Sequence, residues 1–182
     1  ERAAAKLADY GYANVSVLDG GVAGWAKAGY ETYAGFNVPS KAFGEYVEHH
    51  FGTPSVTAEQ LKAMMDGGEN MVILDSRPMD EYNTMNIPGA TCCPGGEPVY
   101  RVHEIAPTTV VVNCAGRTRS IIGAQSLINA GLPNKVVALQ NGTMGWHLSG
   151  FQLQHGNTAL HPDPSAPAVL VAKQRADDVE QR

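Results

Sequence analysis

The residues best suited to chemistry lie together in one short stretch, VVVNCAGRTRS, which runs from Val110 to Ser120. An apolar run leads directly into Cys114, and a glycine and two arginines separate this cysteine from the next helical pattern. A cysteine that only fills a hydrophobic core needs no such neighbours. A cysteine thiolate, however, is a nucleophile, and nearby positive charge favours it over the neutral thiol. The stretch therefore predicts a catalytic role for Cys114.

The six residues from Cys114 to Arg119 are expected to form a cradle for an anion. They would curl so that their backbone N–H groups, and those of the first helical turn, point inward. Gly116 is expected to permit the curl, and two guanidinium groups add planar forks that suit oxyanions. Arg117 is the favoured ligand, because Arg119 could instead brace the loop against an acidic neighbour such as Asp75. The expected substrate-binding residues are Ala115, Gly116, Arg117, Thr118, Arg119 and Ser120.

A second class of enzyme also places a cysteine in an anion cradle. Cysteine-dependent phosphatases and arsenate reductases use the spacing C-x5-R, in which the loop encloses a tetrahedral oxyanion. From Cys114 to Arg119 the spacing is C-x4-R, which is one residue shorter. The short loop disfavours phosphate ester hydrolysis and leaves it as an alternative.

Alternating strand and helix patterns surround the loop. A T-x-x-Q capping box opens one helix at Thr57, and Ser120 is expected to cap another. This alternation predicts a doubly wound α/β fold with a parallel sheet, in which ligands bind beyond the carboxyl ends of the strands. Cys114 follows one such strand directly. Continuous apolar runs predict strands at 71–75 (MVILD), 108–113 and 136–139.

The chain also contains an internal repeat. Residues 7–31 resemble residues 127–152, and Trp25 falls on Trp146. Only the second copy follows a strand and a cysteine, so the first copy is expected to be part of a preceding domain. The chain begins with Glu1 and is expected to be a piece of a longer protein. The expected domains are 1–35, the C-terminal part of a preceding copy; 36–54, a linker; 55–155, the complete copy; and 156–182, a linker or tail toward a further domain.

Composition limits the partners and the compartment. The formal net charge of -5 argues against nucleic acid and anionic membranes, which need a basic face. No apolar run approaches the roughly 18 residues of a membrane span. Three cysteines without a C-x-x-C pair suggest neither a disulfide framework nor a zinc ribbon, and His49, His50 and His103 lack the spacing of metal ligands. A reducing compartment, the cytoplasm, is therefore expected.

Five spaced motifs follow one another along the chain: V-I-L-D-S-R with Asp75 and Arg77, E-Y at Glu81 and Tyr82, I-P-G-A from Ile87, C-A-G-R-T-R, and N-G-x-x-G-W ending at Trp146. Taken together, these motifs resemble the rhodanese, or sulfurtransferase, superfamily. The resemblance implies that Cys114 takes a sulfane sulfur from thiosulfate or a similar small anionic donor, becomes a persulfide, and passes the sulfur to cyanide or a thiol. It also implies a five-stranded parallel core and tandem domains of which often only one is active, so a catalytically silent binding module is a further alternative. No cofactor is expected.

Two further pairs of residues receive roles by the same reasoning. Asp75 and Arg77 are expected to support the loop rather than to react. Cys92 and Cys93 follow the I-P-G-A motif, near the active-site rim in family terms. Packing is the favoured interpretation of these two cysteines, and acceptance of sulfur from Cys114 is the alternative.

Overall fold

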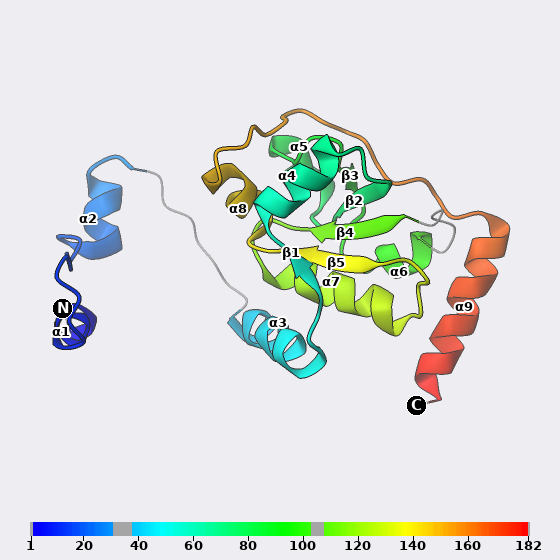
Figure 1. Ribbon diagram of the computed structural model, residues 1–182, viewed down its shortest axis with the longest axis horizontal. Helices are drawn as coiled ribbons and strands as arrows, with labels where there is room; N and C mark the ends of the chain where they lie inside the picture. The colour runs from blue at the N-terminus through cyan, green and yellow to red at the C-terminus, as the bar shows by residue number, and fades with distance from the viewer. Residues whose placement is uncertain (1, 31–37, 103–107, 182) are drawn as a thin grey trace. The chain divides into compact units, whose positions relative to one another are not determined.

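The computed structural model describes residues 2–30, 38–102 and 108–181 (Figure 1). The chain divides into two compact units, residues 1–37 and residues 38–182. None of the helices in the described part of the chain combines the length and the apolar character that a bilayer crossing would require.

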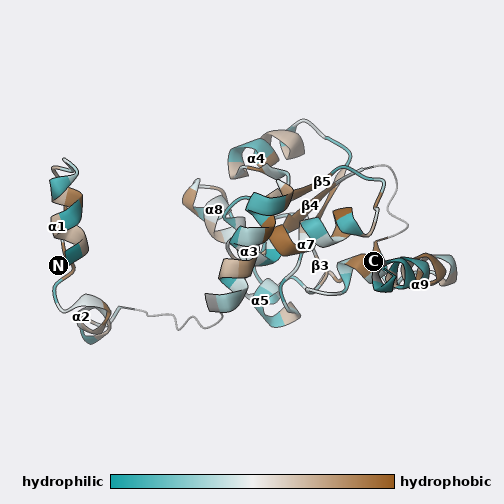
Figure 2. Cartoon of the chain, turned by 90° about the horizontal axis from the view of Figure 1, so that it is seen from below, coloured by the Kyte–Doolittle hydropathy of each residue, from teal (hydrophilic) through white to brown (hydrophobic). Residues whose placement is uncertain are grey.

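A five-stranded sheet forms the centre of the second unit, and all of its strand pairs are parallel. This confirms the predicted α/β fold class. The spatial order is β1 (Ser55–Val56), β5 (Val136–Leu139), β4 (Thr109–Asn113), β2 (Met71–Asp75) and β3 (Thr91–Cys92). Figure 2 shows β4 and β5 as hydrophobic, which agrees with the apolar runs in the sequence.

Helices cover both faces of this sheet (Figure 1). Successive residues of β4 point to opposite faces, so Val110 and Val112 pack in one core and Val111 in the other. A strand buried in this way must be apolar on both sides. One face carries α3 (Val38–Phe51), α6 (Pro98–Arg101) and α7 (Thr118–Asn129), and the other carries α4 (Ala58–Asp66), α5 (Met79–Thr84) and α8 (Gly142–Leu148).

Local sequence signals explain where several elements begin. Thr57 and Gln60 form the predicted capping box, in which the Gln60 N–H donates to Thr57 Oγ1 and the Thr57 N–H to Gln60 Oε1. The strands β2 and β5 have the predicted bounds, and β4 begins one residue later than predicted.

The prediction of a linker at 36–54 is wrong for most of its length, because α3 occupies Val38–Phe51. Val47 of this helix is buried in the core beneath α7. Gly44, one turn earlier, lies so close to α7 that a Cβ atom there would stand 2.8 Å from the Cγ2 atom of Thr118. The spacing of Gly44 and Val47 by three residues puts both on the face that meets α7.

Residues 156–182, predicted to be a linker or tail toward a further domain, pack for much of their length on the second unit. The chain runs beside β3, where the Cys92 N–H donates to the Ala159 carbonyl and the His161 N–H to the Cys92 carbonyl, both at 2.8 Å. The helix α9 (Ala166–Glu180) then packs next to α6, and its Ala168 is buried.

The first unit contains α1 (Arg2–Asp9) and α2 (Gly21–Lys27), and its described residues form no strand. The apolar stretch from Val15 to Leu18, which the repeat aligns with β5, has no ladder partner among the described residues of this unit. A lone strand leaves its backbone groups unpaired, and this explains the difference.

The internal repeat of the sequence reappears as repeated local geometry. Both α2 and α8 begin at a glycine with a positive φ angle, 57° and 53° respectively. The rings of Trp25 and Tyr30 lie 4.4 Å apart between centroids, and those of Trp146 and Phe151 lie 4.7 Å apart. The same sequence pattern has therefore folded into the same helical turn twice.

Candidate active site

Cys114 lies where β4 ends, at the carboxyl edge of the sheet, and is 2% exposed. Its Sγ atom is 3.6 Å from Ser120 Oγ, and that hydroxyl lies 2.8 Å from the carbonyl of Arg117, to which it donates. The prediction that Ser120 caps the helix is wrong, because α7 begins at Thr118 and Arg117 is its N-cap residue. Ser120 instead contacts the sulfur from the first turn of α7.

The carbonyl groups of the loop face α8. The Cys114 carbonyl accepts from the backbone N–H of Thr143 at 2.8 Å and from its hydroxyl at 3.1 Å, and the Ala115 carbonyl accepts from the Met144 N–H at 3.0 Å. A trans peptide places its N–H group opposite its carbonyl. The N–H groups of Ala115 and Gly116 therefore point away from α8, as an anion cradle requires.

The glycine that this arrangement needs is Gly142 rather than Gly116. Gly142 has a φ of 53°, and a Cβ atom there would overlap the Cys114 carbonyl oxygen and lie 2.7 Å from the Gly116 oxygen. Gly116 has no positive φ, and a Cβ atom there would meet nothing within 4 Å. The predicted reason for Gly116 is wrong.

Asp75 and Arg77 form a buried ion pair beneath the loop. Arg77 Nε donates to Asp75 Oδ1 at 2.8 Å and Arg77 Nη2 to Asp75 Oδ2 at 2.7 Å. The same Nη2 atom also donates to the carbonyl of Met85 at 2.7 Å. Loss of either partner would leave an uncompensated buried charge, so each of the two residues fixes the position of the other.

Two further side chains connect this pair to the cysteine. Asn113 Nδ2 lies within hydrogen-bond distance of Asp75 Oδ2 at 2.8 Å and of Thr143 Oγ1 at 3.0 Å. Thr143 Oγ1 in turn reaches the Cys114 carbonyl. A continuous buried network therefore runs from Arg77 to the backbone of Cys114, and it gives Asp75 and Arg77 a route to support the loop.

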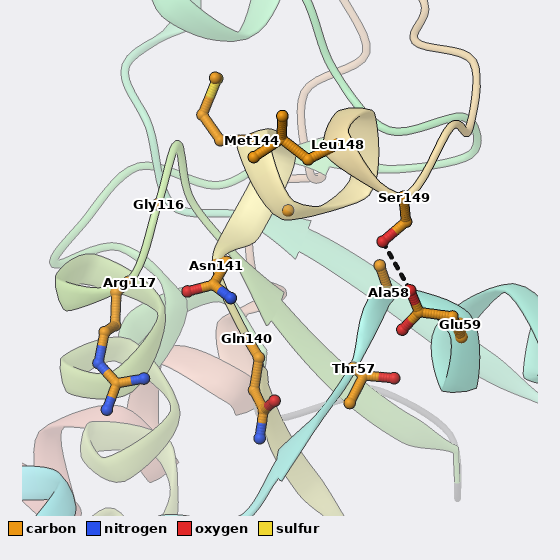
Figure 3. A pocket seen from close by; sticks show the side chains of 11 residues that line it. Thr57, Ala58, Glu59, Gly116, Arg117, Gln140, Asn141, Met144, Leu148 and Ser149 are labelled. Carbon is orange, nitrogen blue, oxygen red and sulfur yellow. Dashed lines mark hydrogen bonds between the residues drawn. The ribbon is translucent and has the colours of Figure 1, made fainter. Parts of the chain in front are cut away.

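Arg117 extends from the loop toward α3, away from Met144 and Leu148 (Figure 3). Its Nε atom donates to Glu45 Oε1 at 2.7 Å, and its Nη2 atom also pairs with Glu48. The hydrogen bond from Arg117 lowers the pKa of the Glu45 carboxyl. The geometry weighs against Arg117 as the substrate ligand, because two carboxylates already hold its guanidinium.

Arg119 extends toward α5 and makes a two-point contact with Glu81. Arg119 Nη1 lies 2.9 Å from Glu81 Oε1 and Arg119 Nη2 lies 2.7 Å from Glu81 Oε2. This hydrogen bond is the main cause of a raised Arg119 pKa, to which the sulfur of Cys114 also contributes. Arg119 is therefore within electrostatic reach of the sulfur, and its acidic neighbour is Glu81 rather than Asp75.

Comparison with known proteins identifies the family of this chain. The model of the rhodanese-like domain family matches residues 57–149. The chain belongs to the rhodanese-like family.

This chain is similar to proteins of three different descriptions. A crystal structure of thiosulfate sulfurtransferase from Pseudomonas aeruginosa is 54% identical, with a TM-score of 0.78, and the match covers 98% of this chain and 35% of that one. A putative sulfur carrier protein, YrkF of Bacillus subtilis, is 27% identical over 67% of this chain and 70% of its own length. An HTH-type transcriptional regulator, Rv0324 of Mycobacterium tuberculosis, is 28% identical over 62% of this chain and 50% of its own length.

Cys92 and Cys93 of the rhodanese-like domain do not reach the active-site rim. Both are fully buried, on opposite faces of the sheet. Burial raises the pKa of the Cys92 thiol to about 11, with a smaller effect of Asp75, and raises that of Cys93 to about 12. Neutral, enclosed thiols are poor nucleophiles, so both cysteines are packing residues.

A cavity of about 550 Å³ borders the outer side of the loop at Gly116 and Arg117 (Figure 3). Met144 and Leu148 of α8 give it an apolar wall. Cys114 is not one of the residues that line it. Among the residues that the structure describes, no group of three or more His, Cys, Asp or Glu side chains is arranged to hold a metal ion.

Sequence reasoning missed most residues that hold the loop from outside. Glu81 appeared only as part of a family motif, and Gly142 only as a match in the repeat. Neither the spacing nor the type of the others distinguishes them from ordinary surface or strand residues. The missed residues are Glu45, Glu48, Glu81, Asn113, Gly142 and Thr143.

Proposed function

We propose that this chain is a sulfurtransferase that works through a persulfide on Cys114. The thiolate attacks the outer sulfur of thiosulfate or a similar donor, a new S–S bond forms, and sulfite leaves with the electron pair of the broken S–S bond. Cyanide or a thiol then attacks the outer sulfur of the persulfide and restores the thiolate. No oxidant or reductant is needed in either step.

The orientation of the loop carries this proposal. The carbonyls of Cys114 and Ala115 are fixed on α8, so the amide groups of Ala115 and Gly116 face the opposite side. Such amides stabilise an anionic sulfur without a metal ion. The likeness to the thiosulfate sulfurtransferase of Pseudomonas aeruginosa supports the same reaction. This chain spans about a third of that protein, and both steps are proposed for the domain alone.

Two alternatives are less well supported. A phosphatase would need a wider loop than the C-x4-R spacing from Cys114 to Arg119 provides, and both arginines are already engaged by carboxylates. A silent binding module would not need the buried network that ends on the Cys114 carbonyl. The loop therefore favours catalysis over both.

We further propose that residues 1–35 are the end of a preceding rhodanese-like domain, whose neighbours in a longer chain are partners of this one. The repeated helical turn of α2 and α8 supports this interpretation, as does the match to the Pseudomonas structure, which extends over both units. Free, buried cysteines suit a reducing compartment such as the cytoplasm.

Mass spectrometry of the intact protein tests the proposed function. After incubation with thiosulfate and removal of excess donor, we expect the mass to rise by one sulfur atom, and addition of cyanide to reverse the gain. Cys114→Ser should show no gain, whereas Cys93→Ser, which keeps the loop intact, should behave as the native protein does. Persulfide on the Cys114→Ser variant would contradict the assignment.

A further inference from the structure

The charges around the Cys114 loop are almost balanced. Arg117 and Arg119 provide two positive charges, and three carboxylates from outside the loop pair with them: Glu45 and Glu48 on α3, and Glu81 on α5. The pKa of the Glu81 carboxyl is lowered, mainly by the hydrogen bond from Arg119. The N-terminus of α7 adds roughly half a positive charge. The loop therefore offers backbone amide hydrogen bonds to an anion, but little net electrostatic attraction.

This balance affects donors of different charge unequally. Thiosulfate carries two negative charges, whereas a thiosulfonate (R–SO2–S⁻) presents the same sulfane sulfur with one. Each carboxylate near the sulfur repels a dianion about twice as strongly as a monoanion at the same position. Removal of one carboxylate charge should therefore help the dianion more.

Glu81 is the carboxylate best placed to have this effect. Its partner Arg119 directly precedes Ser120, whose hydroxyl lies 3.6 Å from the Cys114 sulfur, whereas Arg117 turns toward α3. The sulfur also contributes to the raised pKa of Arg119. Both oxygens of Glu81 are engaged, at 2.9 and 2.7 Å, so the carboxylate both orients this guanidinium and cancels its charge. Its side chain is 41% exposed, so a substitution there should not disturb the core.

We propose that Glu81, acting through Arg119, is a specificity-determining residue that directs the site toward sulfur donors with a single negative charge, such as thiosulfonates. The inference rests on the proposed persulfide chemistry. With a thiosulfonate, the Cys114 thiolate bonds to the sulfane sulfur, the bond between the sulfane and sulfonyl sulfurs breaks, and its electron pair leaves with the sulfinate. The persulfide anion remains on the enzyme, and the charges balance.

The test compares kcat/KM for thiosulfate and for methanethiosulfonate, with cyanide as the common acceptor. We expect Glu81→Gln to raise the ratio of thiosulfate to methanethiosulfonate about three- to ten-fold at low ionic strength, the effect of one unit charge several ångströms away in partly aqueous surroundings. Added salt should shrink the change, because it screens exposed charges. A purely structural role of Glu81 would lower both values together and leave the ratio unchanged.

Two variants serve as matched controls. Glu81→Asp keeps the charge and should keep the native ratio, even if both rates fall. Glu69→Gln removes an exposed carboxylate that precedes β2, at the opposite edge of the sheet, and should also leave the ratio unchanged. If Glu81→Gln still forms the persulfide but keeps the native ratio, the role of Glu81 in donor specificity is wrong, while the proposed function stands. Failure of both donors to place sulfur on native Cys114 would overturn the proposed function with it.

Discussion

Arg117 and Arg119 are two residues apart, yet their guanidinium groups reach different partners. Residues two apart at the start of a helix point about 200° apart around its axis. Arg117 therefore meets Glu45 and Glu48 on α3, and Arg119 meets Glu81 on α5. The Cys114 sulfur contributes to the raised pKa of Arg119, whereas the raised pKa of Arg117 is caused by Glu45 and Glu48.

Arg119→Ala is expected to impair sulfur transfer from thiosulfate more than Arg117→Ala does. The substitution removes a charged donor near the sulfur and leaves Glu81 unpaired there, so a loss of about 1.5–3 kcal/mol, or roughly ten- to a hundred-fold in kcat/KM, follows. Arg117→Ala should cost less than about three-fold, since its guanidinium is bound on the outer side. Steady-state kinetics of the two variants measure the two losses. A larger loss for Arg117→Ala would support Arg117 as the substrate ligand, as the sequence suggested.

Cys92 and Cys93 should resist alkylation in the folded protein. Burial raises their thiol pKa values to about 11 and about 12, so at pH 8 both are protonated as well as enclosed. Limited treatment with iodoacetamide followed by peptide mass spectrometry should label neither until denaturant is added. Rapid labelling of Cys92 under native conditions would show that the rim interpretation was right.

At the scale of elements, the N-terminus of α8 holds the catalytic loop in place. Thr143 supplies both a backbone N–H and a hydroxyl to the Cys114 carbonyl, and its side chain is fully buried. The loop and α8, which are separate in the sequence, are therefore joined at the residue on which the proposed chemistry depends.

Thr143→Val should therefore lower both stability and turnover. It keeps the shape and the backbone N–H but removes the hydroxyl that lies between Asn113 and the Cys114 carbonyl, which is expected to cost about 1–3 kcal/mol in the free energy of unfolding. Urea titration measures the stability, and the rate of persulfide formation measures the effect on the loop. Thr143→Ser, which keeps the hydroxyl, should recover most of both; if it is as impaired as Thr143→Val, packing of the methyl group is what matters.

The segment beside β3 should respond to pH through His161. Burial lowers the pKa of this imidazole below 6.5, and the positive charge of Arg101 lowers it further. Between the lowered value and 6.5 the unfolded chain binds more protons than the folded one, so stability rises with pH across this window. The contribution is complete above 6.5 and is lost as the pH falls toward the folded value.

His161→Gln should accordingly flatten the acid side of the stability curve. The native protein is expected to lose more of its melting temperature than this variant between neutral pH and pH values below 6.5. Thermal melts in matched buffers give the comparison. Parallel curves for the two proteins would mean that His161 is not responsible for acid sensitivity in this range.

At the scale of the whole molecule, the tryptophan of the repeated helical turn is buried to a different extent in the two units. The helical turn is shared, but Trp146 is 2% exposed above its sheet, whereas Trp25 in the first unit is 42% exposed. A helix with an apolar face gains stability by covering a sheet, and the first unit has no strand among its described residues. That difference is consistent with the proposal that residues 1–35 are part of a larger domain.

Tryptophan fluorescence can report this difference directly. Acrylamide should quench Trp25 strongly and Trp146 weakly, because a quencher reaches only exposed rings, so Trp25→Phe should remove most of the quenchable emission. Trp146→Phe should leave a strongly quenched spectrum. Weak quenching of both residues would show that Trp25 is covered in solution.

The sequence by itself determined the family and the fold class, and it predicts Cys114 as the nucleophile. Continuous apolar runs specify strands buried on both faces, and the cysteine follows one of them directly, so local pattern was sufficient. The T-x-x-Q capping box and the repeated glycine and tryptophan spacing could also be recognised in the sequence, because their interactions span only a few residues.

Only the tertiary structure decided what each loop residue does. Arg117 and Arg119 look alike in the sequence, and their roles depend on Glu45, Glu48 and Glu81, which α3 and α5 bring from as far as 72 residues away. The same holds for α3. Its sequence contains no strong helix motif and is interpreted as a linker, and only its packing against α7 shows that Val47 belongs to the core. Charge balance and burial are sums over neighbours in space, and the linear order of residues does not contain them.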